Sequence, residues 1–205
     1  SVTELTGIAI PENQQTDEVR KLVEALSKLA TTDVKTGLPN ARAMDEILTQ
    51  RLAMAKSHER AKERRREAPK TVSFVAIDLD GFKGINDTLG HKGGDAALKY
   101  FADFSKEHLR PGDTIARLGG DEFGVLMEAN EETAAKIIDR LRKGLSKKPF
   151  EYEGNTPPMS FSFGVHEITA QDEDIAVIKD DADQKALTDK EGKSERLQGP
   201  AARKI

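Results

Sequence analysis

Hydrophobic residues recur along the chain with two different periods. Apolar residues near the N-terminus follow one another at spacings of three and four, the stripe of an amphipathic helix; they are Val19, Leu22, Leu26 and Leu29. Helical periodicity also predicts helices at residues 41 to about 66, 94–109, 131–145 and 175 to about 190, and a short one at 83–87. The chain is therefore expected to be rich in helices, most of them amphipathic.

Other apolar runs have the length and composition of strands. Residues 72–79 are almost all apolar, which predicts a central strand buried on both faces. Runs at 114–118 and 123–127 predict two strands joined by a tight hairpin, and residues 159–165 predict a further strand. Strands alternating with helices, together with one hairpin, predict an α+β fold with a central mixed, largely antiparallel sheet flanked by helices.

The stripe near the N-terminus is expected to be a stalk helix. We expect residues 1–31 to form a polar, loose linker and this helix, residues 32–195 to form one globular domain, and residues 196–205 to form a tail. The stripe covers fewer than two heptads, which is too short for a stable coiled coil on its own. It favours a stalk that pairs with its copy in a dimer; the alternative is a helix folded back on its own domain.

Composition narrows the class of protein. Of the 205 residues, 33% are charged and 37% are hydrophobic, and no apolar run reaches the roughly 18–20 residues that a membrane helix needs. Cysteine is absent, which excludes disulfides and thiolate metal sites. We expect a cytoplasmic location with no signal peptide, although a longer parent protein with an upstream sensory domain, now missing, could be anchored in a membrane.

Charge argues mildly against nucleic acid as a partner. The net charge is −4, yet residues 51–70 carry eight lysine and arginine residues against three glutamates. This basic stretch is interpreted as the solvated end of a long helix. Contact with RNA or an acidic partner is the alternative, and the absence of aromatic residues there weakens it.

The chemistry is expected at the turn of the hairpin. Gly119 and Gly120 permit positive φ and close approach of a ligand to the backbone, and Asp121 and Glu122 follow directly. Paired glycines and paired acids at a hairpin tip predict a platform for phosphate and metal. The alternative is a glycine-rich turn whose acids are merely solvated.

Five separated blocks together resemble a known family. They are Thr36-Gly37-Leu38-Pro39-Asn40, the run from Asp78-Leu79-Asp80-Gly81-Phe82-Lys83 to Asn86-Asp87, Gly90-His91 with Gly94-Asp95, Arg117-Leu118 with Gly119 to Phe123, and Ser162-Phe163-Gly164-Val165. In this order they resemble the GGDEF family, the diguanylate cyclases, over roughly residues 32–193. The resemblance implies a fold akin to the palm of nucleotidyl cyclases and polymerases, and makes 32–195 a GGDEF catalytic domain.

A metal site is expected where the buried strand meets the hairpin. Asp78 lies near the end of that strand, and if the hairpin pairs beside it, Asp78 and Asp121 approach each other. Two carboxylates plus substrate phosphates suit Mg²⁺; otherwise Asp78 is a strand-end acid facing solvent. The resemblance implies that Asp78, Leu79 and Asp121 hold two Mg²⁺ or Mn²⁺ ions per active site, and that Asp78, Asp121 and Glu122 are catalytic.

Other residues are expected to hold the nucleotide. Backbone N–H groups at Phe82 and Lys83 could cradle phosphates, beside Gly119 and Gly120. The resemblance implies that Asn86 and Asp95 select guanine, and hence GTP over ATP. Asp95 could instead be the N-cap of the helix it opens.

The late helix departs from the family pattern. The resemblance implies a lysine there that grips the triphosphate, which makes Lys190 the candidate and Lys193 a weaker one. Asp189 stands at the usual alanine, Gly192 is one residue early, and a tyrosine is missing near Leu187 or Thr188. In the first block, Lys35 replaces a usual leucine.

The activity implied is condensation of two GTP into cyclic di-GMP with release of two pyrophosphates. Each domain would hold one GTP, so catalysis would need a homodimer. Two other classes stay open: an inactive domain that acts as a receptor for GTP or cyclic di-GMP, and a structural interaction module whose basic helix carries the function.

A regulatory site is expected before the hairpin. Arg110 and Asp113 match the RxxD inhibitory site of the family, where cyclic di-GMP would bind as product and inhibitor; Arg140 or Arg142 could supply a second arginine. Arginine can form bidentate hydrogen bonds with a guanine edge or a phosphate, and aspartate can accept hydrogen bonds from guanine N–H groups. The alternative is a plain turn, in which Pro111-Gly112 ends the helix.

Overall fold

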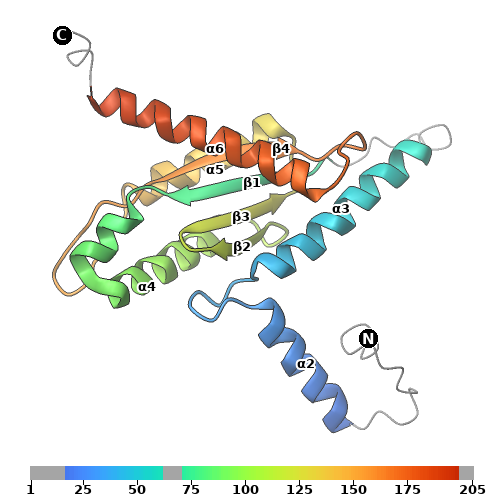
Figure 1. Cartoon of the computed structure of the whole chain (residues 1–205), viewed down its shortest axis with the longest axis horizontal. Coiled ribbons are helices and arrows are strands. Elements are labelled where there is room, and N and C mark those ends of the chain that lie inside the picture. Colours follow the sequence, from blue (N-terminus) through green and yellow to red (C-terminus); the bar gives the residue numbers. More distant parts are fainter. Residues whose placement is uncertain (1–16, 62–70, 199–205) are drawn as a thin grey trace.

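A computed structural model describes residues 17–61 and 71–198. Its elements follow in the order α2 (Asp17–Thr31), α3 (Ala41–Ala61), β1 (Ser73–Leu79), α4 (Phe82–His108), β2 (Thr114–Gly119), β3 (Glu122–Met127), α5 (Glu131–Leu145), β4 (Phe161–Glu167) and α6 (Ile175–Gln198) (Figure 1). The linker expected at residues 1–16, the basic residues 62–70 and the tail from 199 onward lie outside the described residues.

The four strands form one sheet in the order β2-β3-β1-β4. All three pairings within it are antiparallel, and a parallel bridge joins Asn40 to Arg117 at its edge. The α+β fold predicted from the sequence is confirmed. The last strand begins two residues later than predicted, because the ladder with β1 runs from Leu79 opposite Phe161 to Ser73 opposite Glu167.

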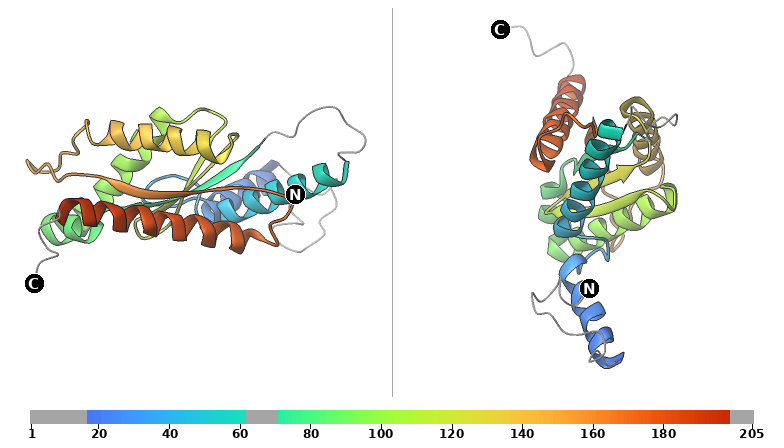
Figure 2. Two further views of the ribbon diagram at one scale, coloured as in Figure 1. Left: turned by 90° about the horizontal axis from the view of Figure 1, so that it is seen from above. Right: turned by 90° about the vertical axis from the view of Figure 1, so that its right-hand side faces the viewer.

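Alternation along β1 divides the core between two faces of the sheet. Val75, Ile77 and Leu79 belong to a buried cluster with residues of α4 and α5. Phe74 and Ala76 belong to a second cluster with residues of α3 and α6. The helices therefore cover both faces, as Figure 2 shows, and the prediction of a strand buried on both sides is confirmed.

The same alternation decides where Asp78 points. Because side chains of a strand alternate, Asp78 lies on the face of Phe74 and Ala76, under α3 and α6. The α6 helix approaches this face closely: a Cβ at Gly164 of β4 would lie 2.0 Å from the carbonyl oxygen of Ala182. Glycine at position 164 thus lets α6 pack closely against the sheet, opposite Ala76 in the middle of β1.

The helix after β1 differs from the prediction. Instead of a short helix and a separate one opened by Gly94-Asp95, α4 runs from Phe82 to His108 with one break at Gly90 (φ 70°, ψ 175°). That backbone conformation favours glycine, which has no Cβ. The second helical segment therefore starts after Gly90, and Asp95 lies inside it. The alternative interpretation of Asp95 as an N-cap is wrong.

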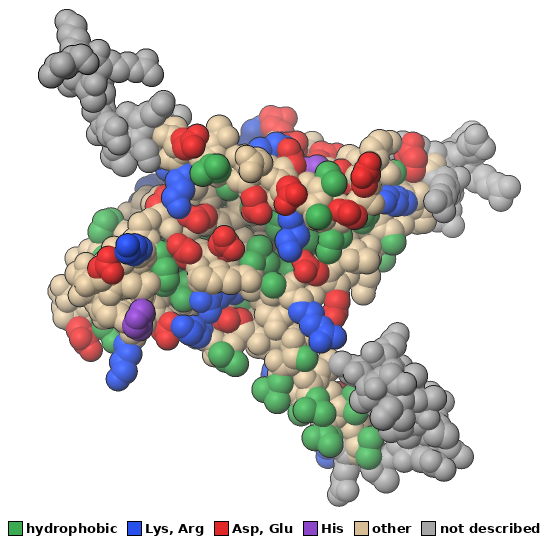
Figure 3. All heavy atoms as spheres, viewed as in Figure 1, with side chains coloured by type: hydrophobic (Ala, Val, Ile, Leu, Met, Phe, Trp, Pro, Cys, Tyr) green, Lys and Arg blue, Asp and Glu red, His purple; other side chains and the backbone are tan. Residues whose placement is uncertain are grey.

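The N-terminal helix α2 extends away from the sheet (Figure 1). Leu22, Leu26 and Leu29 are 60%, 52% and 70% exposed, and hydrophobic side chains line this helix in the space-filling view (Figure 3). The helix predicted from the stripe is confirmed, and its leucines are not covered by the chain's own domain. Within the described residues, no helix is both long and apolar enough to cross a lipid bilayer.

Candidate active site

The hairpin tip and the end of β1 come together as expected. In the ladder between β1 and β3, Asp78 lies opposite Glu122, and the backbone N–H of Leu79 donates to the carbonyl oxygen of Asp121 over 3.2 Å. The residues expected to hold metal, Asp78, Leu79 and Asp121, are therefore neighbours. Asp78 is partly buried and ion-paired, so it is not simply a strand-end acid in solvent.

A buried arginine holds the tip in shape. The side chain of Arg117 is 9% exposed and donates twice to the carbonyl oxygen of Gly120, over 3.1 and 2.7 Å, and once to Asp33 over 3.0 Å. Gly120 itself has φ +46°, which a residue with a Cβ adopts rarely. Both glycines of the tip are exposed, so their backbone is open to a ligand.

Several negatively charged carboxylates lie close to Glu122. Partial loss of hydration raises the pKa of this carboxyl, and the negative charges of Asp183, Asp121 and Asp78 raise it further. Asp183 belongs to α6 and was missed by the sequence analysis. The signal for it was the spacing of Lys179, Asp183 and Lys190, which places all three along one side of a helix.

The late lysine reaches these acids. Lys190 of α6 places its Nζ 2.5 Å from Oδ1 of Asp78. That hydrogen bond raises the pKa of Lys190 against the opposing effect of partial burial, and the charges of Asp80 and Asp121 add to it. A lysine 112 residues away in sequence thus lies over the predicted metal acids, where it would meet a triphosphate.

These groups line one cavity of about 350 Å³. It is bounded by Asp78 of β1, Glu122 of β3 and, from α6, by Lys179, Asp183 and Lys190. Carboxylate oxygens with a lysine beside them suit a divalent cation that borrows further oxygens from phosphates. Among the described residues, no group of three or more Asp, Glu, His or Cys side chains is arranged to hold a metal ion by itself.

The residues expected to read guanine gather on α4. Gly94 packs so closely that a Cβ there would lie 2.0 Å from Oδ1 of Asn86 and 3.4 Å from the ring of Phe82. Asn86 and Asp95 are thereby brought to adjacent positions across the break in the helix. The carboxylate of Asp95 accepts a hydrogen bond from Lys35 over 2.7 Å.

The start of α4 supplies the expected phosphate cradle. The helix begins at Phe82 after Gly81, which has φ 68°, and the first N–H groups of a helix lack partners within it. Lys83 is exposed in this first turn. Phe82 and Lys83 therefore present backbone N–H groups directly after the strand that carries Asp78.

Lys193, the weaker candidate for the phosphate contact, is hydrogen-bonded within the domain. Its Nζ donates to Oδ2 of Asp80 over 3.0 Å, to Oγ of Ser162 over 3.0 Å, and to the carbonyl oxygen of Phe161. Burial works to raise the pKa of Asp80, but the hydrogen bonds from Ser162 and Lys193 outweigh it and leave the pKa lowered. Lys193 thus ties α6 to β1 and β4.

Asp189, one of the departures from the family pattern in this helix, has charged partners in the structure. Its carboxylate lies 2.7 Å from Arg142 of α5 and 3.4 Å from Lys193. Asp189 therefore belongs to an ionic network inside the domain. Since Arg142 is held by Asp189 and Asp139 and lies over the ring of Phe163, the exposed Arg140 is the more accessible of the two arginines considered for the regulatory site.

Arg110 and Asp113 form a turn between α4 and β2. The carboxylate of Asp113 accepts from the backbone N–H of Arg110 over 3.1 Å, and the N–H of Asp113 donates to the carbonyl oxygen of Arg110 over 2.9 Å. Arg110 is exposed, and within the described residues its guanidinium has no ion pair. The turn leaves this side chain available to a ligand.

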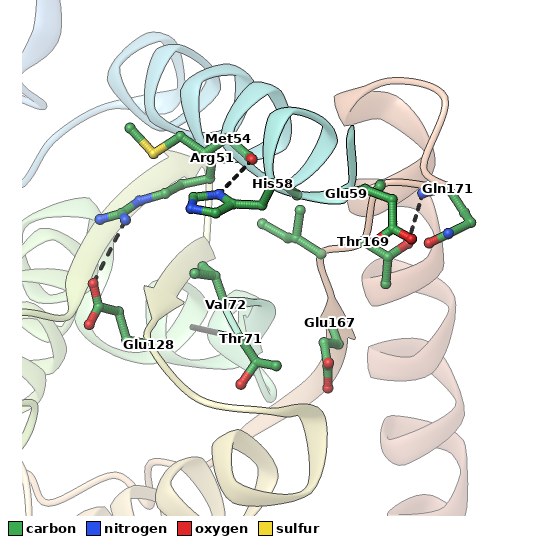
Figure 4. A pocket seen from close by; sticks show the side chains of 13 residues that line it. Arg51, Met54, His58, Glu59, Thr71, Val72, Glu128, Glu167, Thr169 and Gln171 are labelled. Atoms are coloured by element: carbon green, nitrogen blue, oxygen red, sulfur yellow. Dashed lines mark hydrogen bonds and ion pairs between the residues drawn. The ribbon is translucent and has the colours of Figure 1, made fainter. Parts of the chain in front are cut away.

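A second cavity lies at the other end of the sheet, beyond the start of β1. It has a volume of about 400 Å³ between α3 and the segment after β4, with Arg51, His58, Glu128 and Glu167 among its lining residues (Figure 4). Arg51 and Glu128 form an ion pair of 3.8 Å across it. None of the residues predicted to be functional lines this cavity.

Comparison with known proteins agrees with this geometry. The family model described as "Diguanylate cyclase, GGDEF domain" matches residues 30–196. Diguanylate cyclase DgcP of Pseudomonas aeruginosa is 35% identical over 170 residues, which is 82% of this chain and 24% of that protein. Diguanylate cyclase A of Treponema denticola is 31% identical over 198 residues, 96% of this chain and 48% of that protein. The chain therefore spans about half or less of these relatives.

A solved structure shows the same similarity in three dimensions. The coiled coil and GGDEF domain of DgcB from Caulobacter crescentus, determined in complex with c-di-GMP, superposes with a TM-score of 0.75 at 26% identity, covering 86% of this chain and 88% of that one. With the family model matched over most of its length, this chain belongs to the GGDEF domain family of diguanylate cyclases.

Proposed function

We propose that this chain condenses two molecules of GTP into cyclic di-GMP and releases two pyrophosphates. The observation that carries the proposal is the convergence of Asp78, Glu122 and Lys190 at one cavity, with the charge of Asp121 close by, in a chain that belongs to the GGDEF family. GTP as substrate agrees with the cytoplasmic location expected from the sequence.

Each residue has a role in this reaction. Asp78, Asp121 and the carbonyl oxygen of Leu79 would hold two Mg²⁺ or Mn²⁺ ions, which lower the pKa of an attacking oxygen and stabilise a leaving one. Lys190 would exchange its ion pair with Asp78 for the triphosphate. The N–H groups at Phe82 and Lys83, with Gly119 and Gly120, would bind phosphate oxygens. Asn86 and Asp95 would bind guanine.

Glu122 is suited to proton transfer. Its raised pKa places it nearer to neutral pH than an ordinary glutamate, so it accepts a proton more readily. We propose that it takes the proton of the 3′-hydroxyl, or accepts it through a water molecule, as that oxygen attacks the α-phosphate of the second GTP. A new P–O bond forms and the bond to pyrophosphate breaks.

We propose that two copies of the chain act together. One domain holds one GTP, and each 3′-hydroxyl must reach the α-phosphate held by the other domain, which a monomer cannot arrange. The exposed leucines of α2 offer an apolar stripe for the pairing. Burial of three leucines from each copy would contribute on the order of several kcal/mol, at about 1.5–3 kcal/mol for each side chain fully buried.

A turnover assay tests the proposal. The chain is incubated with GTP and Mg²⁺, and cyclic di-GMP and pyrophosphate are quantified by chromatography and a coupled assay. We expect both products in a ratio of one to two. GTP bound without turnover would contradict the proposed reaction.

Binding of GTP without turnover would favour a second function, that of a receptor for GTP or cyclic di-GMP. The observation on its side is the state of α6, where Lys190 is paired with Asp78 and Lys193 with Asp80. If these pairs persisted with nucleotide bound, the triphosphate would lack its cations. Calorimetric titration with GTP and with cyclic di-GMP distinguishes a receptor from an interaction module that binds neither.

A further inference from the structure

Lys35 lies where the base of the nucleotide is expected. It belongs to the turn between α2 and α3, and its Nζ lies 2.7 Å from Oδ1 of Asp95, across 60 residues of sequence. Both side chains are 46% exposed. An exposed ion pair of this kind stabilises a fold by only about 0–1 kcal/mol, so stability gives little reason for it.

The turn that carries Lys35 is rigid. Asp33 accepts hydrogen bonds from the backbone N–H and the hydroxyl of Thr36, over 2.9 and 2.7 Å, and Thr36 and Leu38 are fully buried. Gly37 has φ +68°, in the left-handed region. Because its neighbours are fixed, Lys35 is held beside Asp95 and is not one of many lysines that reach it by chance.

The pair leaves hydrogen-bonding capacity unused. Lys35 engages Oδ1 of Asp95, and within the described residues Oδ2 has no hydrogen-bond partner. A carboxylate oxygen accepts about two hydrogen bonds, and an ammonium group has three N–H donors, of which one is used here. An acceptor and two donors are thus displayed side by side toward solvent.

The edge of guanine carries donors and an acceptor that complement these groups of Asp95 and Lys35. Its N1–H and N2–H donors lie next to the O6 acceptor, so one base edge can engage a carboxylate and an ammonium group together. We propose that Lys35 is a third guanine-reading residue beside Asn86 and Asp95, which donates to O6 while Oδ2 of Asp95 accepts from N1–H or N2–H. The inference rests on the proposed function, and adds to it a residue that sets base specificity.

ATP would not isolate this contact, because adenine also presents a donor beside an acceptor. The informative ligand lacks O6 and keeps an N–H donor for Oδ2 of Asp95, as 2-aminopurine does through its amino group at position 2. Because N1 of 2-aminopurine carries no proton, this probe retains only the N2–H contact with Asp95. Triphosphates without the 3′-hydroxyl cannot be condensed, so binding can be measured without turnover. The probes are therefore 3′-deoxy-GTP and the 3′-deoxyriboside triphosphate of 2-aminopurine.

The test is calorimetric titration of both probes into the whole chain with Mg²⁺. We expect Lys35→Met to weaken the binding of 3′-deoxy-GTP by about tenfold or more, because one charge-assisted hydrogen bond is lost. Binding of the 2-aminopurine probe is expected to change less than about twofold. The matched control is Lys99→Met, which removes a similarly exposed lysine that is ion-paired with Asp103 and lies one helical turn from Asp95 on α4, so it tests the effect of losing a nearby positive charge.

Other results would overturn the inference. If Lys35→Met weakened the binding of both probes equally, or if Lys99→Met weakened it to the same extent, Lys35 would act only through its positive charge and not through a contact with O6. Tighter binding of both probes by Lys35→Met would mean that Lys35 competes with the base for Asp95. If wild type binds neither probe, the proposed function fails as well, whereas probe binding that Lys35→Met leaves unaltered refutes only the role of Lys35.

Discussion

At the scale of single residues, the site depends on acids that the fold holds close to one another. Asp78 and Glu122 face each other across two strands, and Asp121 is joined to Leu79 by a backbone hydrogen bond. Like charges at such positions oppose ionisation unless a cation lies between them. In the structure Lys190 is ion-paired with Asp78, and Lys179 is the cation that acts on Glu122.

Asp121→Asn is expected to abolish cyclic di-GMP formation and to leave the fold intact, because the residue lies at a hairpin tip outside the core. Asp78→Asn should also abolish it. Asp78→Asn removes a charge at a partly buried strand end, which favours stability, but it also removes the ion pair with Lys190, so we expect melting temperatures within a few degrees of wild type. Turnover and thermal circular dichroism measure both effects; activity retained by Asp121→Asn at saturating Mg²⁺ would exclude the two-metal assignment.

Glu122 gives a prediction about pH. Its pKa is higher in the folded chain than its ordinary value of 4.5, so its ionisation favours the unfolded state. Stability is therefore lost as the pH rises from below 4.5 through the raised folded pKa. Glu122→Gln should melt at a higher temperature than wild type near pH 7.5, and this difference should shrink toward zero below pH 4.5.

The control for this experiment is Glu151→Gln, at an exposed glutamate between α5 and β4. Its melting temperature should follow that of wild type at every pH. A pH-independent difference between Glu122→Gln and wild type would mean that lost contacts, and not ionisation, account for the change.

At the scale of elements, the hairpin, the buried strand and the tip with its acids were predicted from the sequence and are confirmed. Short-range patterns sufficed, since apolar alternation and paired glycines are local. Contacts across long separations were not predicted: Lys35 with Asp95, Arg117 with Asp33, and Asp183 beside Glu122. No local pattern states which distant charges meet, because that depends on how α6 and the turn before α3 dock.

The start of the helical segment at Asp95 was also predicted wrongly. Gly93-Gly94-Asp95 suggested a helix start, because glycine and aspartate are common there. The break occurs earlier, at Gly90, and the glycine at 94 serves packing against Asn86 and Phe82. A glycine needed for close approach has the same appearance in sequence as a glycine that ends or begins a helix.

Gly94→Ala should weaken GTP binding through Asn86. The added Cβ would lie 2.0 Å from Oδ1 of Asn86, so that side chain must move away from its position near Asp95. We expect KM for GTP to rise about tenfold, as for one lost hydrogen bond. Gly84→Ala on the same helix is the control, because nothing lies within 4 Å of a Cβ there.

A double variant tests whether the effect of Gly94→Ala on KM acts through Asn86. Asn86→Ala removes the atom that the new Cβ meets, so Gly94→Ala with Asn86→Ala should be more stable than Gly94→Ala alone and no worse in KM. Additive effects on KM would mean that Gly94 acts independently of Asn86.

At the scale of the whole molecule, two surfaces bear on how copies meet. Leu22→Asp should lower specific activity at low protein concentration by separating protomers, because it places a charge within an exposed apolar stripe. Lys28→Asp, on the polar side of α2, should leave activity near wild type. Activity and sedimentation are measured across a dilution series; unchanged activity of Leu22→Asp at the lowest concentration would make the stalk dispensable.

The second surface is the turn at Arg110. If cyclic di-GMP binds there, Arg110→Ala should weaken its affinity by about tenfold or more and relieve inhibition of turnover, while Lys106→Ala at the same helix end should do neither. Calorimetry and progress curves with added product measure both. Equal affinity in wild type and Arg110→Ala would leave Arg110 and Asp113 with the structural role of a turn.

The placement of α6 has a consequence for how the chain acquires its charges during synthesis. Asp78, Asp121 and Glu122 are made before residue 130, whereas Lys179 and Lys190 follow β4 and are made last. Since a domain generally folds as a unit, a chain that has been synthesised only as far as β3 carries the acids without the lysine that pairs with Asp78. If Lys190 meets the triphosphate as proposed, a nascent chain gains that contact only once α6 has been made and has docked on the sheet.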